Sequence, residues 1–121
     1  MKTTLDLTNG RVTVVEDRLN PGFYLPRHCH KEITEIFYVL DGEIEFTFDD
    51  ETVTATSGMT INVPPNIWHD VKSDNGGRLI TIFSLGGFEK YLEEMASLTD
   101  EQFADEELMT ALAEKYDTWM R

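Results

Sequence analysis

Residues 22–42 read GFYLPRHCHKEITEIFYVLDG, and this stretch is the most informative part of the sequence. It holds two of the three histidines, His28 and His30, and it ends in a β-branched and aromatic run that begins at Glu35. Residues two apart on an extended strand point the same way, with roughly 7 Å between their side-chain origins. The two imidazoles therefore suit one shared metal ion. Cys29 lies between them and should face the opposite way, as a small buried hydrophobe rather than a ligand.

A second stretch, GMTINVPPNIWH at residues 58–69, carries the third histidine, His69, after a proline-rich turn. Three imidazoles and the carboxylate of Glu35 make a mixed nitrogen and oxygen site that suits iron, manganese, nickel, copper or zinc. The site lacks the thiolates of a structural zinc knuckle. The alternative to a metal site is that the His-x-His pair occurs by chance. The carboxylate at the start of the strand would then be exposed at a sheet edge.

The hydrophobic pattern around these stretches has a period of two as far as residue 84. Residues 43–48 alternate between polar and apolar, and Asp49 and Asp50 turn the chain into residues 52–55, which predicts a hairpin. Residues 59–63 alternate again until Pro64 ends the run, and a turn at residues 74–77 leads into an apolar run at 78–84. Many short strands joined by tight turns predict an all-β sandwich or barrel.

The period becomes helical after residue 87. Residues 88–95 form an amphipathic pattern, and Thr99 followed by Gln102 fits a capping box. Helical spacing of apolar residues then continues from Leu108 to Trp119. We expect a β-barrel over residues 1–87 and, in the same domain, a helical extension over residues 88–121 that packs on the outside of the barrel. A helical arm that reaches a second subunit is the alternative.

Length and charge narrow the classes of function. A chain of 121 residues is one domain's worth. Ten basic against 23 acidic residues give a formal net charge of -13, which disfavours nucleic acid and anionic membrane surfaces as partners. No apolar run is long enough to cross a bilayer or to act as a signal peptide. One cysteine permits no intrachain disulfide, which agrees with a reducing compartment, and we expect a cytoplasmic protein.

The two stretches resemble the two sequence motifs of the cupin superfamily, G(x)5HxH(x)3,4E(x)6G and G(x)5PxG(x)2H(x)3N. The first matches at every defined position, from Gly22 to Gly42, and fifteen residues separate it from the second, which starts at Gly58. The second motif has Asn66 in place of its glycine and Ser73 in place of its last asparagine. Asn tolerates the positive φ that a turn glycine serves. We expect the three motif glycines to lie where the chain reverses between strands.

The resemblance implies a cupin barrel, also called a double-stranded β-helix or jelly roll, followed by short C-terminal α-helices. It implies one divalent transition metal ion (Fe, Mn, Ni, Cu or Zn) held inside by His28, His30, Glu35 and His69. One or two coordination positions would stay open for a substrate or O2. Inward apolar residues should form the cavity wall, or simply pack the core; the candidates are Tyr24, Phe37, Val39, Phe46, Phe48, Ile61, Val71 and Phe83.

Within the superfamily, the segment from Glu35 to Gly42, together with Gly86 to Glu89 and the helical tail, looks most like small quercetinase-type cupins. That likeness implies a metal-dependent dioxygenase acting on a small hydroxylated aromatic or enolisable substrate. Glu35 would then be both a ligand and the catalytic acceptor of the substrate's hydroxyl proton. Two alternatives stay open: an oxygen-independent lyase, isomerase or cyclase that uses the metal as a Lewis acid, and a non-catalytic binder of metal or small molecules. Small cupins often pair, so a homodimer is expected.

Overall fold

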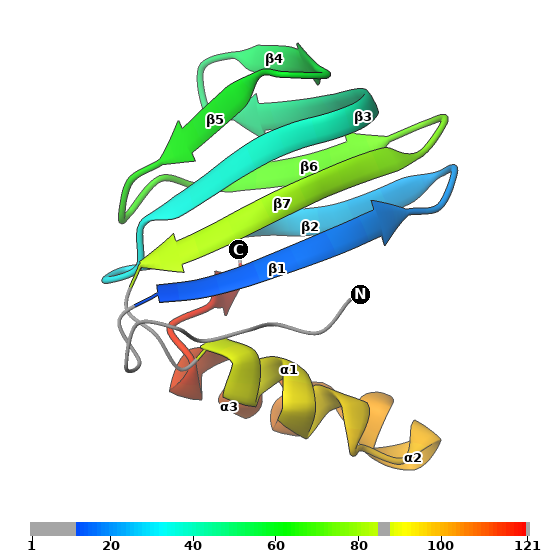
Figure 1. The fold of residues 1–121 in the computed structure, drawn as a ribbon. Helices are drawn as coiled ribbons and strands as arrows, with labels where there is room; N and C mark the ends of the chain where they lie inside the picture. The colour runs from blue at the N-terminus through cyan, green and yellow to red at the C-terminus, as the bar shows by residue number, and fades with distance from the viewer. Residues whose placement is uncertain (1–11, 85–87, 121) are drawn as a thin grey trace.

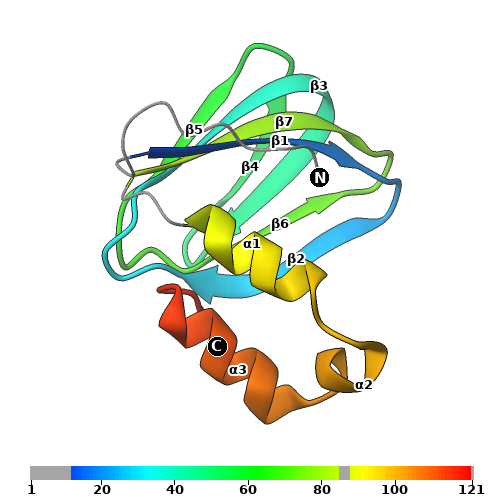
Figure 2. The same ribbon diagram turned by 60° about the horizontal axis from the view of Figure 1, so that its bottom comes forward.

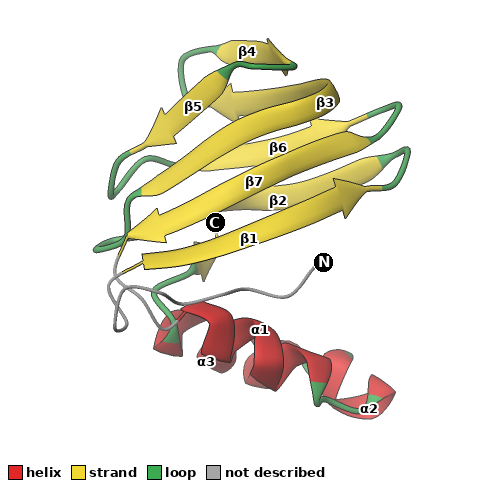
Figure 3. Cartoon of the chain, in the orientation of Figure 1, coloured by secondary structure: helices red, strands yellow, loops and turns green. Residues whose placement is uncertain are grey.

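The computed structural model describes residues 12–84 and 88–120 (Figure 1). Antiparallel strands come first and short helices follow, as the sequence predicts, and one more short strand comes after them (Figure 3). The strands are β1 (Val12–Leu19), β2 (Phe23–Cys29), β3 (Glu35–Phe48), β4 (Thr52–Thr56), β5 (Thr60–Val63), β6 (His69–Ser73) and β7 (Gly77–Ser84). The tail holds α1 (Phe88–Ala96), α2 (Asp100–Phe103), α3 (Glu106–Lys115) and the short strand β8 (Trp119–Met120). Among these helices none is long and apolar enough to cross a membrane.

The strands form one curled antiparallel sheet, and β3 is its centre. The first half of β3 pairs with β5 and β7, and β7 pairs with β1. The second half of β3 pairs with β4 and β6, and β2 follows β6 and ends the curl beside β8. Because one long strand serves both halves, the sheet folds over on itself and encloses an interior, which is the predicted cupin barrel.

Gly42 lies inside β3, so the expectation that it marks a chain reversal is wrong. It has a φ of 89°, and a Cβ at this position would lie 2.5 Å from the carbonyl oxygen of Gly76, just before β7. Only glycine permits this backbone geometry at so close an approach. Gly42 therefore carries β3 from one half of the barrel to the other. Gly22 and Gly58 do lie in turns, both with positive φ.

Side chains that alternate along the strands fill the barrel interior. On β3 and β7, the odd-numbered residues Phe37, Val39 and Leu79 point inward, while Tyr38 and Ile80 point outward. The main core consists of Leu19, Phe37, Val39, Ile44, Phe46, Ala55, Val63, Val71 and Leu79. This period-two burial is the pattern read from the sequence.

The C-terminal tail differs from its prediction at its end. The helix ends at Lys115, and the chain turns at Asp117, with a φ of 56°, into β8, so the expected helix through Trp119 is wrong. The helices lie together beside β1 and β2 (Figure 2). A second core joins them to the strands and consists of Val15, Ile33, Phe83, Tyr91 and Ala113. The predicted capping box of Thr99 and Gln102 is present at α2.

Candidate metal centre

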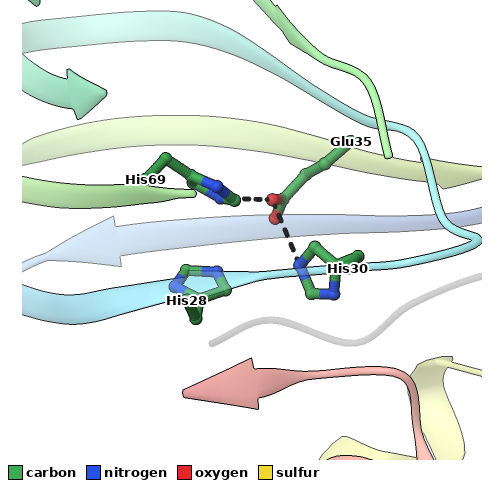
Figure 4. Close-up of side chains that lie close together, drawn as sticks. All are labelled: His28, His30, Glu35 and His69. Carbon is green, nitrogen blue, oxygen red and sulfur yellow. Dashed lines mark hydrogen bonds and ion pairs between the residues drawn. The ribbon is translucent and has the colours of Figure 1, made fainter. Parts of the chain in front are cut away.

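Four potential metal ligands from three parts of the chain meet inside the barrel (Figure 4). His28 and His30 come from the end of β2 and just beyond it, Glu35 opens β3, and His69 opens β6. One donor atom from each of these residues lies within 4.8 Å of all the others, and all four side chains are buried. The structure thus brings together every residue that the sequence nominated. The cluster is compatible with one divalent metal ion, and its thiolate-free donor set suits a transition metal.

The three imidazoles are held in the same way, through their Nδ1 atoms. His28 Nδ1 lies 2.8 Å from the carbonyl oxygen of Pro26, and His69 Nδ1 lies 2.9 Å from that of Ile67. His30 Nδ1 lies 2.9 Å from the carbonyl oxygen of Asp117. A carbonyl oxygen only accepts, so each Nδ1 carries the donated proton. In the neutral rings each Nε2 then has a lone pair, which is the arrangement that metal-binding histidines need.

The Nε2 atoms of two histidines lie so close to the carboxylate oxygen that a cation is needed between them. His69 Nε2 lies 3.0 Å from Glu35 Oε1, and His30 Nε2 lies 3.4 Å from the same oxygen. A lone pair of a neutral ring and a carboxylate oxygen repel each other at these distances unless a proton or a metal ion lies between them. A divalent ion would meet this need for both histidines, so the residues present fit the metal that the motif implies.

The charge states of the cluster follow from burial and from these contacts. Burial would raise the pKa of Glu35, but its contacts with His30 and His69 outweigh burial and lower that pKa to about 2. Burial lowers the pKa of His28 to about 4, and the nearby His69 adds to the effect. Burial opposes the protonation of His30 too, yet Glu35 and Asp117 outweigh it and raise its pKa. The site therefore offers a carboxylate and a neutral His28 at neutral pH.

A cavity of about 300 Å³ opens beside the cluster, at the lower limit of the size of small-molecule sites. His28, His30 and Glu35 line it. Its walls are mostly apolar, with Asp17, Thr81 and Thr118 as the other polar residues. The apolar wall consists of Leu19, Phe23, Leu25, Phe37, Val71, Leu79, Phe83, Met95 and Met120, with Tyr91 beside them. Four of these lining residues belong to the tail, so the tail also contributes to the wall of the cavity.

Three of the predicted wall residues line the cavity: Phe37, Val71 and Phe83. Val39 and Phe46 are buried in the core instead, and Phe48 and Ile61 pack partly buried against it. The prediction for Tyr24 is wrong, because this side chain is 59% exposed. The pairing of β2 with β6 shifts between Leu25 and His28. Odd-numbered residues point inward before this irregularity, and even-numbered residues point inward after it. Phe23 and Leu25 therefore share the cavity with His28.

The second motif explains how His69 is presented. Asn66 has a φ of 68°, so it takes the left-handed conformation that was expected of it in place of glycine. Its backbone N–H donates to the carbonyl oxygen of His30, at 2.6 Å, and this contact joins the two motifs. Ser73, in place of the motif's asparagine, donates through Oγ to the carbonyl oxygen of Glu43.

Sequence reasoning missed Asp117 and Asp17. Asp117 contacts His30 across 87 positions of sequence, so no local spacing could reveal it. Asp17 is a carboxylate on the inward face of β1, between Val15 and Leu19. An acidic residue at an inward position of an alternating strand is a signal that could have found it.

Comparison with known proteins decides the family. The family model described as the cupin domain matches residues 15–83, which is more than half of the chain and includes all four residues of the cluster. The chain is a cupin. A comparison with curated proteins found no match.

Solved structures agree with this fold. An RmlC-like cupin from Shewanella frigidimarina superposes on the cupin chain with a TM-score of 0.62 at 23% identity, over 73% of this chain and 87% of that one. The structure of KdgF from Halomonas sp. gives a TM-score of 0.62 at 18% identity, over 74% of this chain and 93% of that one. The Cnp3 cupin domain of Schizosaccharomyces pombe gives 0.62 at 18% identity, over 76% and 69%. Identities this low show the fold alone.

Proposed function

We propose that this cupin is an enzyme that holds one divalent transition metal ion through His28, His30, Glu35 and His69. Its substrate would be a small hydroxylated aromatic or enolisable molecule, bound in the adjoining cavity. A single observation carries the proposal: three imidazoles and a carboxylate converge, all buried, and three of these four residues line a cavity with mostly apolar walls. Perturbed ionisable groups in such a cavity are typical of an active site.

The residues of the site have distinct roles in this proposal. A bound ion would act as a Lewis acid that lowers the pKa of a substrate hydroxyl. Phe37 and Phe83 would pack against a flat apolar substrate and exclude water. Glu35 would be a ligand first. A carboxylate with a pKa of about 2 is a weak base, so it would accept the hydroxyl proton only if that hydroxyl has itself become acidic.

The preferred reaction is a dioxygenation, in which both atoms of O2 enter the organic product. The resemblance to quercetinase-type cupins supports it. The same site would also serve an oxygen-independent lyase, isomerase or cyclase, and a binder without turnover would need no reaction at all. Oxygen consumption separates the first class from the second, and turnover separates both from the third.

Metal analysis of the purified, tag-free protein tests the binding step. We expect near-stoichiometric transition metal in the wild type and its loss in a His28→Ala, His30→Ala double variant. Cys29→Ala is the matched control, because Cys29 is buried between the two histidines and belongs to no metal-binding group among the described residues. Loss of metal from this control as well would mean that the strand, not the ligands, is being tested. A wild type that takes up no added divalent ion would refute the site.

Oxygen uptake with a panel of flavonols and diketones tests the reaction. We expect uptake only with metal-loaded protein, and at least a 100-fold lower rate in Glu35→Gln at equal metal content. Substrate loss without oxygen uptake would favour the Lewis-acid alternative. Metal binding without turnover of any panel member would favour the binder.

We also propose that the cupin forms a homodimer through the outer face of its first sheet half. Outward residues of three neighbouring strands make this face apolar: Val14 pairs with Ile82, which pairs with Ile36, and Tyr38 lies beside Ile80. Val14 is 38% exposed and Tyr38 is 39% exposed. A second copy of the same face would cover these side chains.

A further inference from the structure

We propose that Asp117 is a positioning residue of the metal centre. Residues 116–120, which we name the C-terminal strap, would fix His30 and the loop after it in the geometry that binds metal. Strap docking and metal binding would then reinforce each other. This inference rests on the proposed function, and its test below is arranged so that the two can fail separately.

The carboxylate of Asp117 organises the loop that joins two of the ligands. Its Oδ1 accepts from the backbone N–H of Lys31 at 2.8 Å, and its Oδ2 accepts from those of Glu32 and Ile33 at 2.7 and 3.0 Å. Three successive amides that converge on one anion form a strong, directional cradle. These amides lie directly between His30 and Glu35. The path of the loop between these two ligands is therefore shaped by a side chain from the far end of the sequence.

The backbone of the same residue holds the ring of His30. The carbonyl oxygen of Asp117 accepts from His30 Nδ1 at 2.9 Å, which sets the tautomer and the rotation of the ring. The other two histidines use carbonyls two residues away, at Pro26 and Ile67, so their own strand ends orient them. His30 alone among the three depends on a partner 87 residues away. Its orientation is a consequence of tertiary docking.

The strap is held firmly enough to do this. Met120 pairs with His28, and Trp119 pairs with Cys29, so β8 extends the sheet at the ligand-bearing strand. Trp119 Nε1 donates to Asp117 Oδ1 at 3.1 Å, and Lys31 Nζ lies 3.8 Å from the centroid of the Trp119 ring. Asp117 itself has a φ of 56°, a conformation that a residue with a side chain adopts at some cost. Such strain persists where the surrounding contacts require it.

Coupling follows from these contacts. If docking of the strap raises the affinity of the site for an ion by some factor, then a bound ion must stabilise the docked strap by the same factor. Loss of an outer partner of a metal-binding histidine typically lowers metal affinity by about 10- to 100-fold. The strap should therefore change metal binding although it provides no ligand.

The test compares Asp117→Ala and Asp117→Asn in the full chain, with Co²⁺ as the probe. Titration of metal-free protein, followed by calorimetry and by the visible absorption of bound Co²⁺, should show a 10- to 100-fold loss of affinity in Asp117→Ala. Asp117→Asn should recover part of the loss, because Asn tolerates the left-handed conformation and keeps one acceptor oxygen. The matched control is Asp105→Ala, which removes another carboxylate cap from the same tail, at the start of α3, and should stay within twofold of the wild type.

A second readout needs no metal. In NMR of the metal-free protein, the Nδ1–H proton of His30 should give a slowly exchanging signal, because the carbonyl oxygen of Asp117 accepts from it. Asp117→Ala should remove this signal and leave those of His28 and His69 unchanged. A folded Asp117→Ala variant with unaltered Co²⁺ affinity, or with an unaltered His30 Nδ1–H signal, would overturn the positioning role. A wild type that binds no Co²⁺ would defeat the proposed function alone, and the Nδ1–H signal would then decide the role of Asp117.

Discussion

Asp17 is a half-buried carboxyl on the inward face of β1, opposite Leu79 on β7 and on the wall of the cavity. Burial raises the pKa of Asp17 above its ordinary value of 3.8. An acid with a raised folded-state pKa binds its proton more readily in the folded chain. It therefore favours the folded state at low pH, and this contribution is lost as the pH rises through the folded-state pKa.

We predict that Asp17→Asn stabilises the protein at pH 7 and that the gain shrinks toward pH 4. Thermal unfolding of the wild type and the variant across this pH range measures the difference in their stability. The other titrating groups contribute equally to both proteins and cancel in this difference. Glu16→Gln is the matched control, because Glu16 lies on the outer face in an ion pair with Arg78 at 2.7 Å. It should give no gain. A stability gain from Asp17→Asn that is the same at pH 4 and pH 7 would contradict the titration argument.

The residues of the site show what a sequence can predict. The spacing of His28 and His30 is local, and strand geometry predicts directly that their side chains point the same way. Glu35 required the first motif, because a loop lies between it and His30. His69 required the second motif, since β3, β4 and β5 separate it from Glu35 in the chain. Asp117 could not be predicted, because its role exists only once β8 lies beside β2. The prediction for Tyr24 was wrong because the alternation of inward and outward side chains is interrupted at Pro26 and Arg27.

At the scale of elements, β3 is the strand on which the barrel depends, and Gly42 is its pivot. We predict that Gly42→Ala costs about 3 kcal/mol or more, because the new Cβ meets both an unfavourable φ and the backbone of Gly76 and Gly77. Gly58→Ala is the control: its φ is 90°, but a Cβ there would meet nothing within 4 Å. It should cost only about 1 kcal/mol. Urea unfolding measures both costs, and equal costs would mean that β3 and β7 can move apart at Gly42.

An aromatic stack joins α1 to the end of α3, and one of its rings also belongs to the core that connects the tail to the barrel. The rings of Tyr91 and Tyr116 are stacked with centroids 5.4 Å apart, and Tyr91 is buried against the second core. We predict that Tyr91→Ala loosens α1 and α3 by about 2 kcal/mol or more and leaves the barrel core intact. Amide hydrogen exchange should show faster exchange in the tail and unchanged protection in β3 and β7. Leu108→Ala, on the exposed side of α3, should leave exchange unaltered.

Element boundaries were predictable where the local pattern decides them and not elsewhere. The hairpin around Asp49 and the capping box at Thr99 follow from neighbouring residues, and both are present. The continuity of β3 through Gly42 is fixed by β7 on the other side, which local sequence does not show. The same holds for the end of α3. Helical spacing continues to Trp119, but pairing with β2 converts the last residues into a strand.

At the scale of the whole molecule, charge and the apolar face act against each other. A formal net charge of -13 makes two copies repel at long range, while the face around Ile82 favours their contact. The cations of the described residues are partly engaged already, as in the pairs of Arg27 with Asp49 and Asp70. Added salt screens the repulsion and leaves apolar burial nearly unchanged.

The proposed homodimer should therefore tighten as salt is added. We predict at least a 10-fold lower dimer dissociation constant in 500 mM than in 50 mM NaCl, measured by sedimentation equilibrium. Ile82→Lys should abolish the dimer at both salt concentrations, because it places a charge at the centre of the face. Thr54→Lys adds the same charge on an exposed position of β4 and should leave the dimer intact. A dimer that survives Ile82→Lys would have to use another surface, and a wild type that stays monomeric at high salt would show that the face is too small to hold two copies together.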